Sequence, residues 1–145
     1  MEFSPYFRKV IGVDNDIAVI QDAEKNLALA DIQNCELTVG DVRDEAVLSA
    51  VNANIVVYDI PHWSSHGGTV SEKNPKLDKL IESIRATITN AIAIYAPPHM
   101  TYEDVVELFD DFEYQQVWIA NRYDRNIIYL GPLVEHNGVT KLQLK

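Results

Sequence analysis

The apolar positions of this chain fall into two patterns that alternate along the sequence. Short continuous apolar runs predict buried strands, and stretches with apolar residues three and four positions apart predict helices between them. The predicted strands are residues 9–13, 35–39, 54–60 and 91–96, and the predicted helices are residues 16–30, 45–51, 76–89 and 101–109. In the last helix, Thr101 and Asp104 have the spacing of a capping box, with aspartate in place of the usual glutamate or glutamine.

The pattern changes in the last third of the chain. Residues 115–120 and 126–130 predict two strands across a tight turn at 121–125, which together favour an antiparallel hairpin, and residues 139–144 predict a last short strand. Four alternations of strand and helix followed by a hairpin are typical of an open α/β sheet that is parallel in its body and antiparallel at one edge. We expect a single Rossmann-like domain over residues 1–145.

Charge and cysteine content narrow the function classes. The net charge of −10, from 12 basic and 22 acidic residues, does not favour binding of nucleic acid by this chain alone. Lys9, Arg122 and Arg125 could form a local basic patch, although ordinary surface charge is the simpler interpretation. A single cysteine, Cys35, excludes an internal disulfide. Residues 1–6 show no basic stretch followed by an apolar core, and no apolar run suits a membrane span, so we expect no secretion signal and a cytoplasmic protein.

The candidate chemistry lies where successive predicted strands end. Asp14 follows the first strand, Asp41 follows the second and Asp59 follows the third. In open α/β sheets, ligands bind at the carboxyl ends of the strands. A single aspartate at a strand end is more often a helix cap or a turn former. Three in succession favour a binding site.

With these strand ends, residues 9–133 resemble the class I S-adenosylmethionine-dependent methyltransferases. The resemblance implies a Rossmann-like methyltransferase sheet with S-adenosylmethionine as the cofactor. It implies that Asp14, with Asn15, binds the ribose hydroxyls. Gly40 and Asp41 would lie against the adenine, and Asp41 would accept a hydrogen bond from its amino group.

The third strand end carries the residues that resemble the family's catalytic motif. The motif is often an acid or asparagine, two prolines and an aromatic residue, and here the residues are Asp59, Ile60, Pro61, His62 and Trp63. The resemblance implies that Asp59 contacts the cofactor and, with Pro61, orients a target amine, while Trp63 stacks on a base. Ile60 replaces the first proline, and Trp63 stands one position late.

Within this superfamily the chain is similar to the trimethylguanosine synthases, which methylate an exocyclic guanine nitrogen. The supporting features are Ala23 and Asn26 in the first helix, the tryptophan and Gly67-Gly68 after the third strand, and residues 126–131. The resemblance implies a nucleobase amino group in RNA as the methyl acceptor.

The first strand, the glycine-rich loop and the first helix of the family have no counterpart in the sequence given. In the family sheet that strand lies between those ending at Asp14 and Asp59. The expectation is therefore that these two strands pair directly, that a second chain or a second copy supplies the strand, or that an upstream segment does. Two rival hypotheses follow, a degenerate non-catalytic partner or interaction module and a different Rossmann-like domain that binds NAD or ATP.

Other candidate sites carry less weight. His62 and His66 are four residues apart, but they lie in a predicted glycine- and serine-rich loop without further ligands beside them, so we expect no metal site. Ser64 and Ser65 lack the Gly-x-Ser-x-Gly pattern of a nucleophile elbow, so a hydrolase is not favoured.

Overall fold

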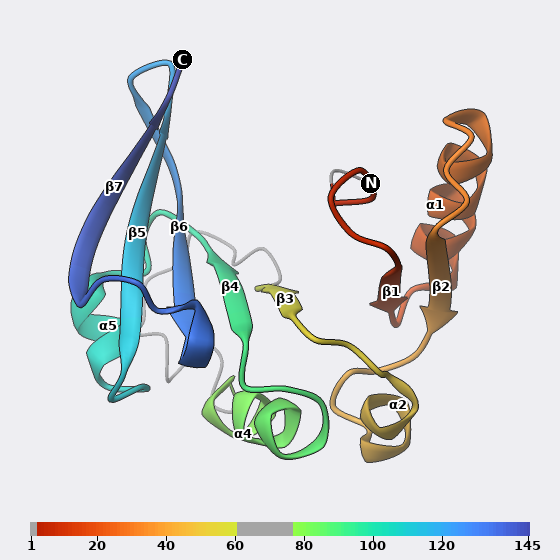
Figure 1. The fold of residues 1–145 in the computed structure, drawn as a ribbon, viewed down its shortest axis with the longest axis horizontal. Helices are drawn as coiled ribbons and strands as arrows, with labels where there is room; N and C mark the ends of the chain where they lie inside the picture. Colours follow the sequence, from red (N-terminus) through yellow and green to blue (C-terminus); the bar gives the residue numbers. More distant parts are fainter. Residues whose placement is uncertain (1–2, 61–76) are drawn as a thin grey trace. The chain divides into compact units, whose positions relative to one another are not determined.

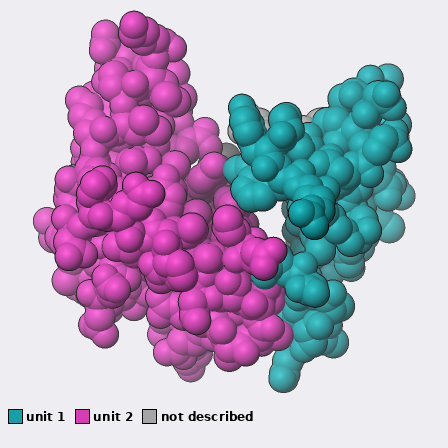
Figure 2. Space-filling model, viewed as in Figure 1, with its two compact units in different colours: residues 1–53 teal, residues 54–145 magenta. Residues whose placement is uncertain are grey.

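The computed structural model describes residues 3–60 and 77–145 (Figure 1). These residues fall into two compact units, residues 1–53 and residues 54–145, each of which is described by itself (Figure 2). The first unit holds β1 (Val10–Asp14), α1 (Ile17–Leu29), β2 (Cys35–Val39) and α2 (Glu45–Ala50). The second holds β3 (Val56–Asp59), α4 (Leu77–Thr87), β4 (Ile92–Ala96), α5 (Tyr102–Val106), β5 (Phe112–Ile119), β6 (Arg122–Leu130), a 3₁₀ helix (Gly131–Leu133) and β7 (Gly138–Leu144).

The first unit is a parallel strand pair with two helices. β1 and β2 pair in register from Val10 opposite Cys35 to Asp14 opposite Val39. The side chain of Asp16 caps α1 by accepting a hydrogen bond from the backbone N–H of Ala18 at 2.8 Å. The buried apolar side chains of this unit are Ile20, Leu27 and Leu48. The three define a small core.

The second unit is built on a five-stranded sheet in the order β3-β4-β6-β5-β7. β3 is parallel to β4, β4 and β5 are both antiparallel to β6, and β7 is parallel to β5. Fully buried side chains line the middle of this sheet and the elements packed on it, and they are Leu77, Ile81, Ile92, Ile94, Met100, Val105, Ile128 and Leu130. Complete burial of one such side chain is worth roughly 1.5–3 kcal/mol. Most of the stability therefore resides in this unit.

The predicted fold class is confirmed: the chain is a mixed α/β fold with parallel pairing and an antiparallel β5–β6 hairpin. Within the described residues of each unit, β1 pairs with β2 and β3 pairs with β4. Direct pairing of the strands that end at Asp14 and Asp59 stays a prediction. A single domain over residues 1–145 stays a prediction. Within residues 3–60 and 77–145, no helix is long and apolar enough to cross a bilayer.

The hairpin differs from its predicted bounds. β5 begins at Phe112 and β6 at Arg122, so the turn is formed by Ala120 and Asn121, with φ of 47° and 64°. Asparagine tolerates this left-handed region, whereas alanine adopts it rarely. The predicted turn at residues 121–125 was therefore too long. Residues 119–122 contain no Asn-Gly or Asp-Gly pair that would have marked the two-residue turn.

Candidate functional site

The first unit brings two of the predicted site residues to one end of a strand pair. Asp14 ends β1 and Asp41 follows β2, and these neighbouring strands run parallel. The backbone N–H of Gly40 donates to the backbone oxygen of Asp14 at 2.9 Å, which extends the pairing past the strand end. Asp14, Asn15, Gly40 and Asp41 therefore lie at the same carboxyl end, where an open α/β sheet binds ligands.

The Asp14 carboxylate stabilises the turn into α1 with one of its oxygens. Its Oδ1 accepts a hydrogen bond from the backbone N–H of Asp16 at 2.8 Å. Asp16, not Asp14, is the residue that caps the helix. Within residues 3–60 and 77–145, Oδ2 of Asp14 has no hydrogen-bond partner. Asp14 thus has a structural role and retains an acceptor for a ligand hydroxyl.

Gly40 allows α2 to lie close to the end of β2. A Cβ atom at this position would come within 2.9 Å and 3.1 Å of the two methyl carbons of Val47 on α2. Real Cβ contacts are not that short, so a larger residue would push the helix away from the strand end. The glycine therefore helps to set the position of Asp41, the next residue.

Asp41 is held by a neighbouring arginine. Its Oδ1 accepts from the backbone N–H of Arg43 at 2.9 Å and from Nε at 2.8 Å, and its Oδ2 accepts from Nη2 at 2.6 Å. These side-chain hydrogen bonds, followed by the backbone one, lower the pKa of Asp41 from 3.8 to about 2. A ligand amino group would have to share the carboxylate with Arg43 or displace the guanidinium.

The second unit places Asp59 beside a charged and aromatic group. Asp59 ends β3, is exposed, and is the register partner of Tyr95 on β4. The guanidinium carbon of Arg125 lies 5.7 Å from the centre of the Tyr95 ring, and its Nε is 2.6 Å from Oδ2 of Asp124. The hydrogen bond that Arg125 donates to Asp124 is the main cause that raises the pKa of Arg125, and the charge of Asp59 adds to it.

The rest of the predicted catalytic motif is only partly described. Ile60 is 4% exposed, and its backbone N–H donates to the oxygen of Tyr95 at 3.0 Å, so the residue in the first proline position extends the β3–β4 pairing. Proline there could not make this hydrogen bond. Pro61 and Trp63 lie outside the described residues. The proposed orientation of a target amine and the stacking on a base stay predictions.

A buried network that the sequence did not predict fixes the loop after β4. The Asn126 side chain, fully buried on β6, donates from Nδ2 to the backbone oxygens of Pro97 at 3.0 Å and Met100 at 2.9 Å. Its Oδ1 accepts from the hydroxyl of Tyr123, and the Met100 oxygen also accepts from the hydroxyl of Tyr114 at 2.6 Å. The network ties the hairpin to a loop at the carboxyl end of the sheet. The one feature of the sequence that could have indicated this network is Asn126, a polar residue at the start of the otherwise mostly apolar run 126–130.

Acidic side chains pair with two of the three residues of the predicted basic patch, which itself stays a prediction. Nζ of Lys9 lies 2.7 Å from the carboxylate of Glu36, and Arg125 is paired with Asp124. These cations are already matched by acids, which agrees with the simpler interpretation as ordinary surface charge. In the part of the chain that the structure describes, no group of three histidine, cysteine or acidic side chains could hold a metal ion. His62 and His66 lie outside it.

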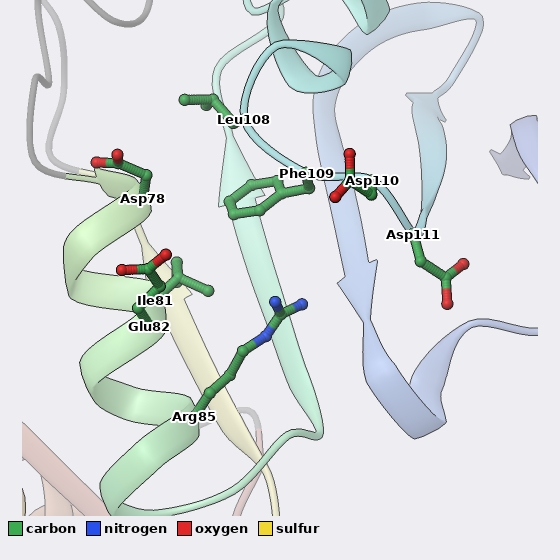
Figure 3. A pocket seen from close by; sticks show the side chains of 8 residues that line it. All are labelled: Asp78, Ile81, Glu82, Arg85, Leu108, Phe109, Asp110 and Asp111. Carbon is green, nitrogen blue, oxygen red and sulfur yellow. The ribbon is translucent and has the colours of Figure 1, made fainter.

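A cavity of about 250 Å³ lies elsewhere in the second unit, between α4 and residues 108–111 (Figure 3). Its lining is Asp78, Ile81, Glu82, Arg85, Leu108, Phe109, Asp110 and Asp111. Phe112, which follows Asp111, lies opposite Leu130 on β6, and Leu130 lies opposite Ile92 at the amino end of β4. The cavity is thus at the end of the sheet opposite to Asp59. Four carboxylates around one arginine would repel an anionic ligand, and we assign no function to it.

Comparison with known proteins identifies the fold. No protein-family model matches the chain, and no curated protein matches it in sequence. Among solved structures, it is similar to a methyltransferase from Geobacter sulfurreducens, with a TM-score of 0.54, 12% identity, and coverage of 84% of this chain and 57% of that one. It is also similar to yhhF of Escherichia coli, which is assigned to the methyltransferases, with a TM-score of 0.52, 16% identity, and coverage of 88% and 66%.

The chain shares its fold with these two structures. At these identities the likeness shows the fold alone, and the chain spans less than two thirds of the length of the Geobacter protein. The resemblance to trimethylguanosine synthases in particular stays a prediction. In the second unit, β6 lies between β4 and β5.

Proposed function

We propose that this chain is a methyltransferase-like domain that holds the adenosine part of S-adenosylmethionine in its first unit. Completed by a further segment or chain, it would act on a nucleobase amino group in RNA. The observation that carries the proposal is the pairing of β1 with β2, which sets Asp14 and Asp41 side by side at one carboxyl end. The fold shared with two methyltransferase structures supports it.

Asp14 has the chemistry for a ribose. Ribose hydroxyls are hydrogen-bond donors, and an ionised carboxylate accepts such bonds more strongly than a neutral group does. Because Oδ1 already holds the Asp16 amide, the local turn is formed before a ligand arrives. Oδ2 would then accept from a hydroxyl without a change in the backbone. This preorganisation lowers the entropic cost of binding.

Asp41 is suited to adenine only in part. The adenine amino group needs an acceptor, and the Asp41 carboxylate is one, but Arg43 occupies both of its oxygens. Binding through Asp41 would therefore require Arg43 to move or to share the acceptor. We expect the ribose contact at Asp14 to contribute more to affinity than the adenine contact at Asp41.

Asp59 would orient the methyl acceptor. S-adenosylmethionine, when bound, supplies the methyl group. The contribution of the chain is to hold the attacking amine in line, because positioning alone accounts for a large part of the acceleration in a displacement. An exposed carboxylate at the end of β3 can accept an N–H of that amine. The charge of Asp59 interacts with that of Arg125.

Calorimetric titration of the full chain with S-adenosylmethionine and with adenosine tests this function. The Asp14→Asn chain keeps an oxygen for the Asp16 amide and loses the charged acceptor. We expect it to bind both ligands roughly tenfold or more weakly, the loss of one hydrogen bond to a charged group. The control is Glu24→Gln, which removes an exposed acidic charge from α1 and should leave both affinities unchanged. Equal affinities for the Asp14→Asn chain and the unchanged chain would refute the assignment.

A second candidate function is a non-catalytic methyltransferase-like partner. Two observations favour it: Arg43 already occupies Asp41, and Ile60 stands buried in the first position of the motif where the family has proline. This candidate predicts no binding of S-adenosylmethionine even at millimolar ligand. The same calorimetric titration therefore separates the two functions.

A further inference from the structure

β3 forms one end of the five-stranded sheet of the second unit (Figure 1). The N–H groups of Val56 and Ile60 donate to β4, to the oxygens of Ala91 and Tyr95, each at 3.0 Å. Successive N–H groups of a strand point to opposite sides. Those of Val57 and Asp59 therefore point away from β4. Within the second unit, as far as its residues 54–60 and 77–145 are described, no strand pairs with them.

The composition of β3 is that of an interior strand. Exposed edges are normally protected by charged side chains, by proline or by bulges, because an open edge invites pairing with another chain. The opposite end strand, β7, follows this rule and has Lys141 in its middle. β3 has Val56, Val57 and Tyr58, and no charge before its last residue. Val57 is 39% exposed, so apolar surface accompanies the open edge.

We propose that the β3 edge binds an apolar strand of a basic partner polypeptide, which extends the sheet beyond β3. Main-chain hydrogen bonds from Val57 and Asp59 would provide affinity, and apolar side chains of the partner would cover Val57. The binding of an added strand is inferred from the open edge of β3 alone. Its place in catalysis rests on the proposed function.

The charge of the chain selects a basic partner over a second copy. With a net charge of −10, two copies repel each other, whereas a cationic polypeptide is attracted. Among the described residues, Lys9 is paired with Glu36 and Arg125 with Asp124, so part of the small positive charge of the chain is already matched by acids. Binding of a phosphate backbone therefore needs positive charge from elsewhere. A basic partner would supply this charge and the strand together.

The test uses the full chain and a synthetic probe, a peptide of alternating valine and isoleucine flanked by lysine pairs. We expect binding by fluorescence anisotropy at low salt and slower hydrogen exchange at the amides of Val57 and Asp59. The Val57→Pro chain loses the outward N–H but no hydrogen bond to β4, and it should bind the probe at least tenfold more weakly. Retained exchange protection at Val56 and Ile60 shows that the variant is folded.

Two matched controls separate the edge from general surface charge. If the Val57→Pro chain does not fold, the Val57→Lys chain is used in its place. Its matched control is Val139→Lys on β7, which should bind the probe as tightly as the unchanged chain. A probe with glutamate pairs in place of the lysines should bind at least tenfold more weakly at low salt. The proposal is overturned by absent binding, by undiminished binding in both β3 variants, or by tight binding of the glutamate probe. It is also overturned if sedimentation shows a dimer that the β3 variants abolish, since the occupant would then be a second copy.

Discussion

Arg43 and Asp41 form a close ion pair at the carboxyl end of β2, with Nη2 2.6 Å from Oδ2 and Nε 2.8 Å from Oδ1. The arginine is two residues from the acid, so the pair is local and does not depend on the rest of the fold. It occupies the group that the methyltransferase resemblance assigns to adenine. The pair thus marks the point where this chain departs most clearly from a ready cofactor site.

Removal of the guanidinium should restore an ordinary carboxyl group at position 41. In the Arg43→Ala chain we expect the pKa of Asp41 to rise from about 2 toward 3.8, because the hydrogen bonds that stabilise its charged form are lost. NMR titration of the side-chain carboxyl measures this directly. Lys25→Ala, which breaks the Lys25–Asp22 pair on α1, should leave the pKa of Asp41 unchanged. A pKa that stays near 2 without Arg43 would contradict the cause assigned to it.

Asn126 should be among the most sensitive positions of the second unit. The Asn126→Ala change removes the hydrogen bond to the backbone oxygen of Pro97 and one of the hydrogen bonds to the backbone oxygen of Met100. An unsatisfied buried polar group costs roughly 1–3 kcal/mol. We expect a loss of about 2–4 kcal/mol in the free energy of unfolding, measured by urea denaturation. Asn52→Ala, at an exposed position of the first unit, should cost less than about 0.5 kcal/mol. Equal losses for the two variants would contradict the role of the network.

Glu113 links β5 to the segment before β7 and should make stability depend on pH. Burial of Glu113 disfavours its charged form, but hydrogen bonds from the backbone N–H groups of Glu135 and His136 and from the Thr140 hydroxyl outweigh burial and lower the pKa. A lowered pKa in the folded state gives stability that is present above the ordinary glutamate pKa and is lost as pH falls through the lowered value.

The corresponding variant is Glu113→Gln. At pH 7 we expect it to be less stable than the unchanged chain by about 1–3 kcal/mol, since a charged acceptor is replaced by a neutral one. The difference should shrink as the pH falls below the ordinary glutamate range, because the unchanged chain then also carries a neutral side chain. Thermal unfolding of both chains between neutral and acidic pH measures it. A gap that stays constant with pH would show that the Glu113 charge is not involved.

Replacement of Ala120 by glycine should be less destabilising than the same replacement of an alanine inside a helix. Its φ of 47° lies in the left-handed region, which costs an L-residue roughly 1–2 kcal/mol, whereas the entropy cost of glycine is roughly 0.5–1 kcal/mol. Ala120→Gly should therefore raise the free energy of unfolding by up to about 1 kcal/mol. Ala28→Gly, inside α1, should lower it by about 1 kcal/mol. A loss of stability in the Ala120→Gly chain would argue against this turn geometry.

These elements also show how far the sequence determines the structure. The strands that end at Asp14 and Ala96 were predictable because continuous β-branched and apolar runs leave few alternatives. The Thr101–Asp104 capping box is confirmed because its groups are three residues apart. The Asp41–Arg43 pair is equally local. The sequence analysis did not predict it, because Asp41 was interpreted as the acceptor for the adenine amino group.

Non-local features were beyond the sequence. The carbonyl groups that Asn126 binds belong to Pro97 and Met100, more than twenty residues away, and only the pairing of β4 with β6 brings them to it. The same holds for Arg125 and Tyr95, whose contact depends on that register. The turn at Ala120 escaped prediction because alanine at positive φ is held by the strands around it, not by its own preference.

Mapping of the adenosine site by NMR tests the central claim most directly. Titration of the isotope-labelled full chain with adenosine should shift the backbone amide signals of Asn15, Gly40 and Asp41, which lie at the carboxyl ends of β1 and β2. Signals of residues that line the acidic cavity, such as Glu82 and Asp110, should stay in place. The Asp14→Asn chain should need roughly tenfold more adenosine for the same shifts. Absence of shifts at the β1 and β2 ends, or shifts confined to the cavity, would contradict the proposed site.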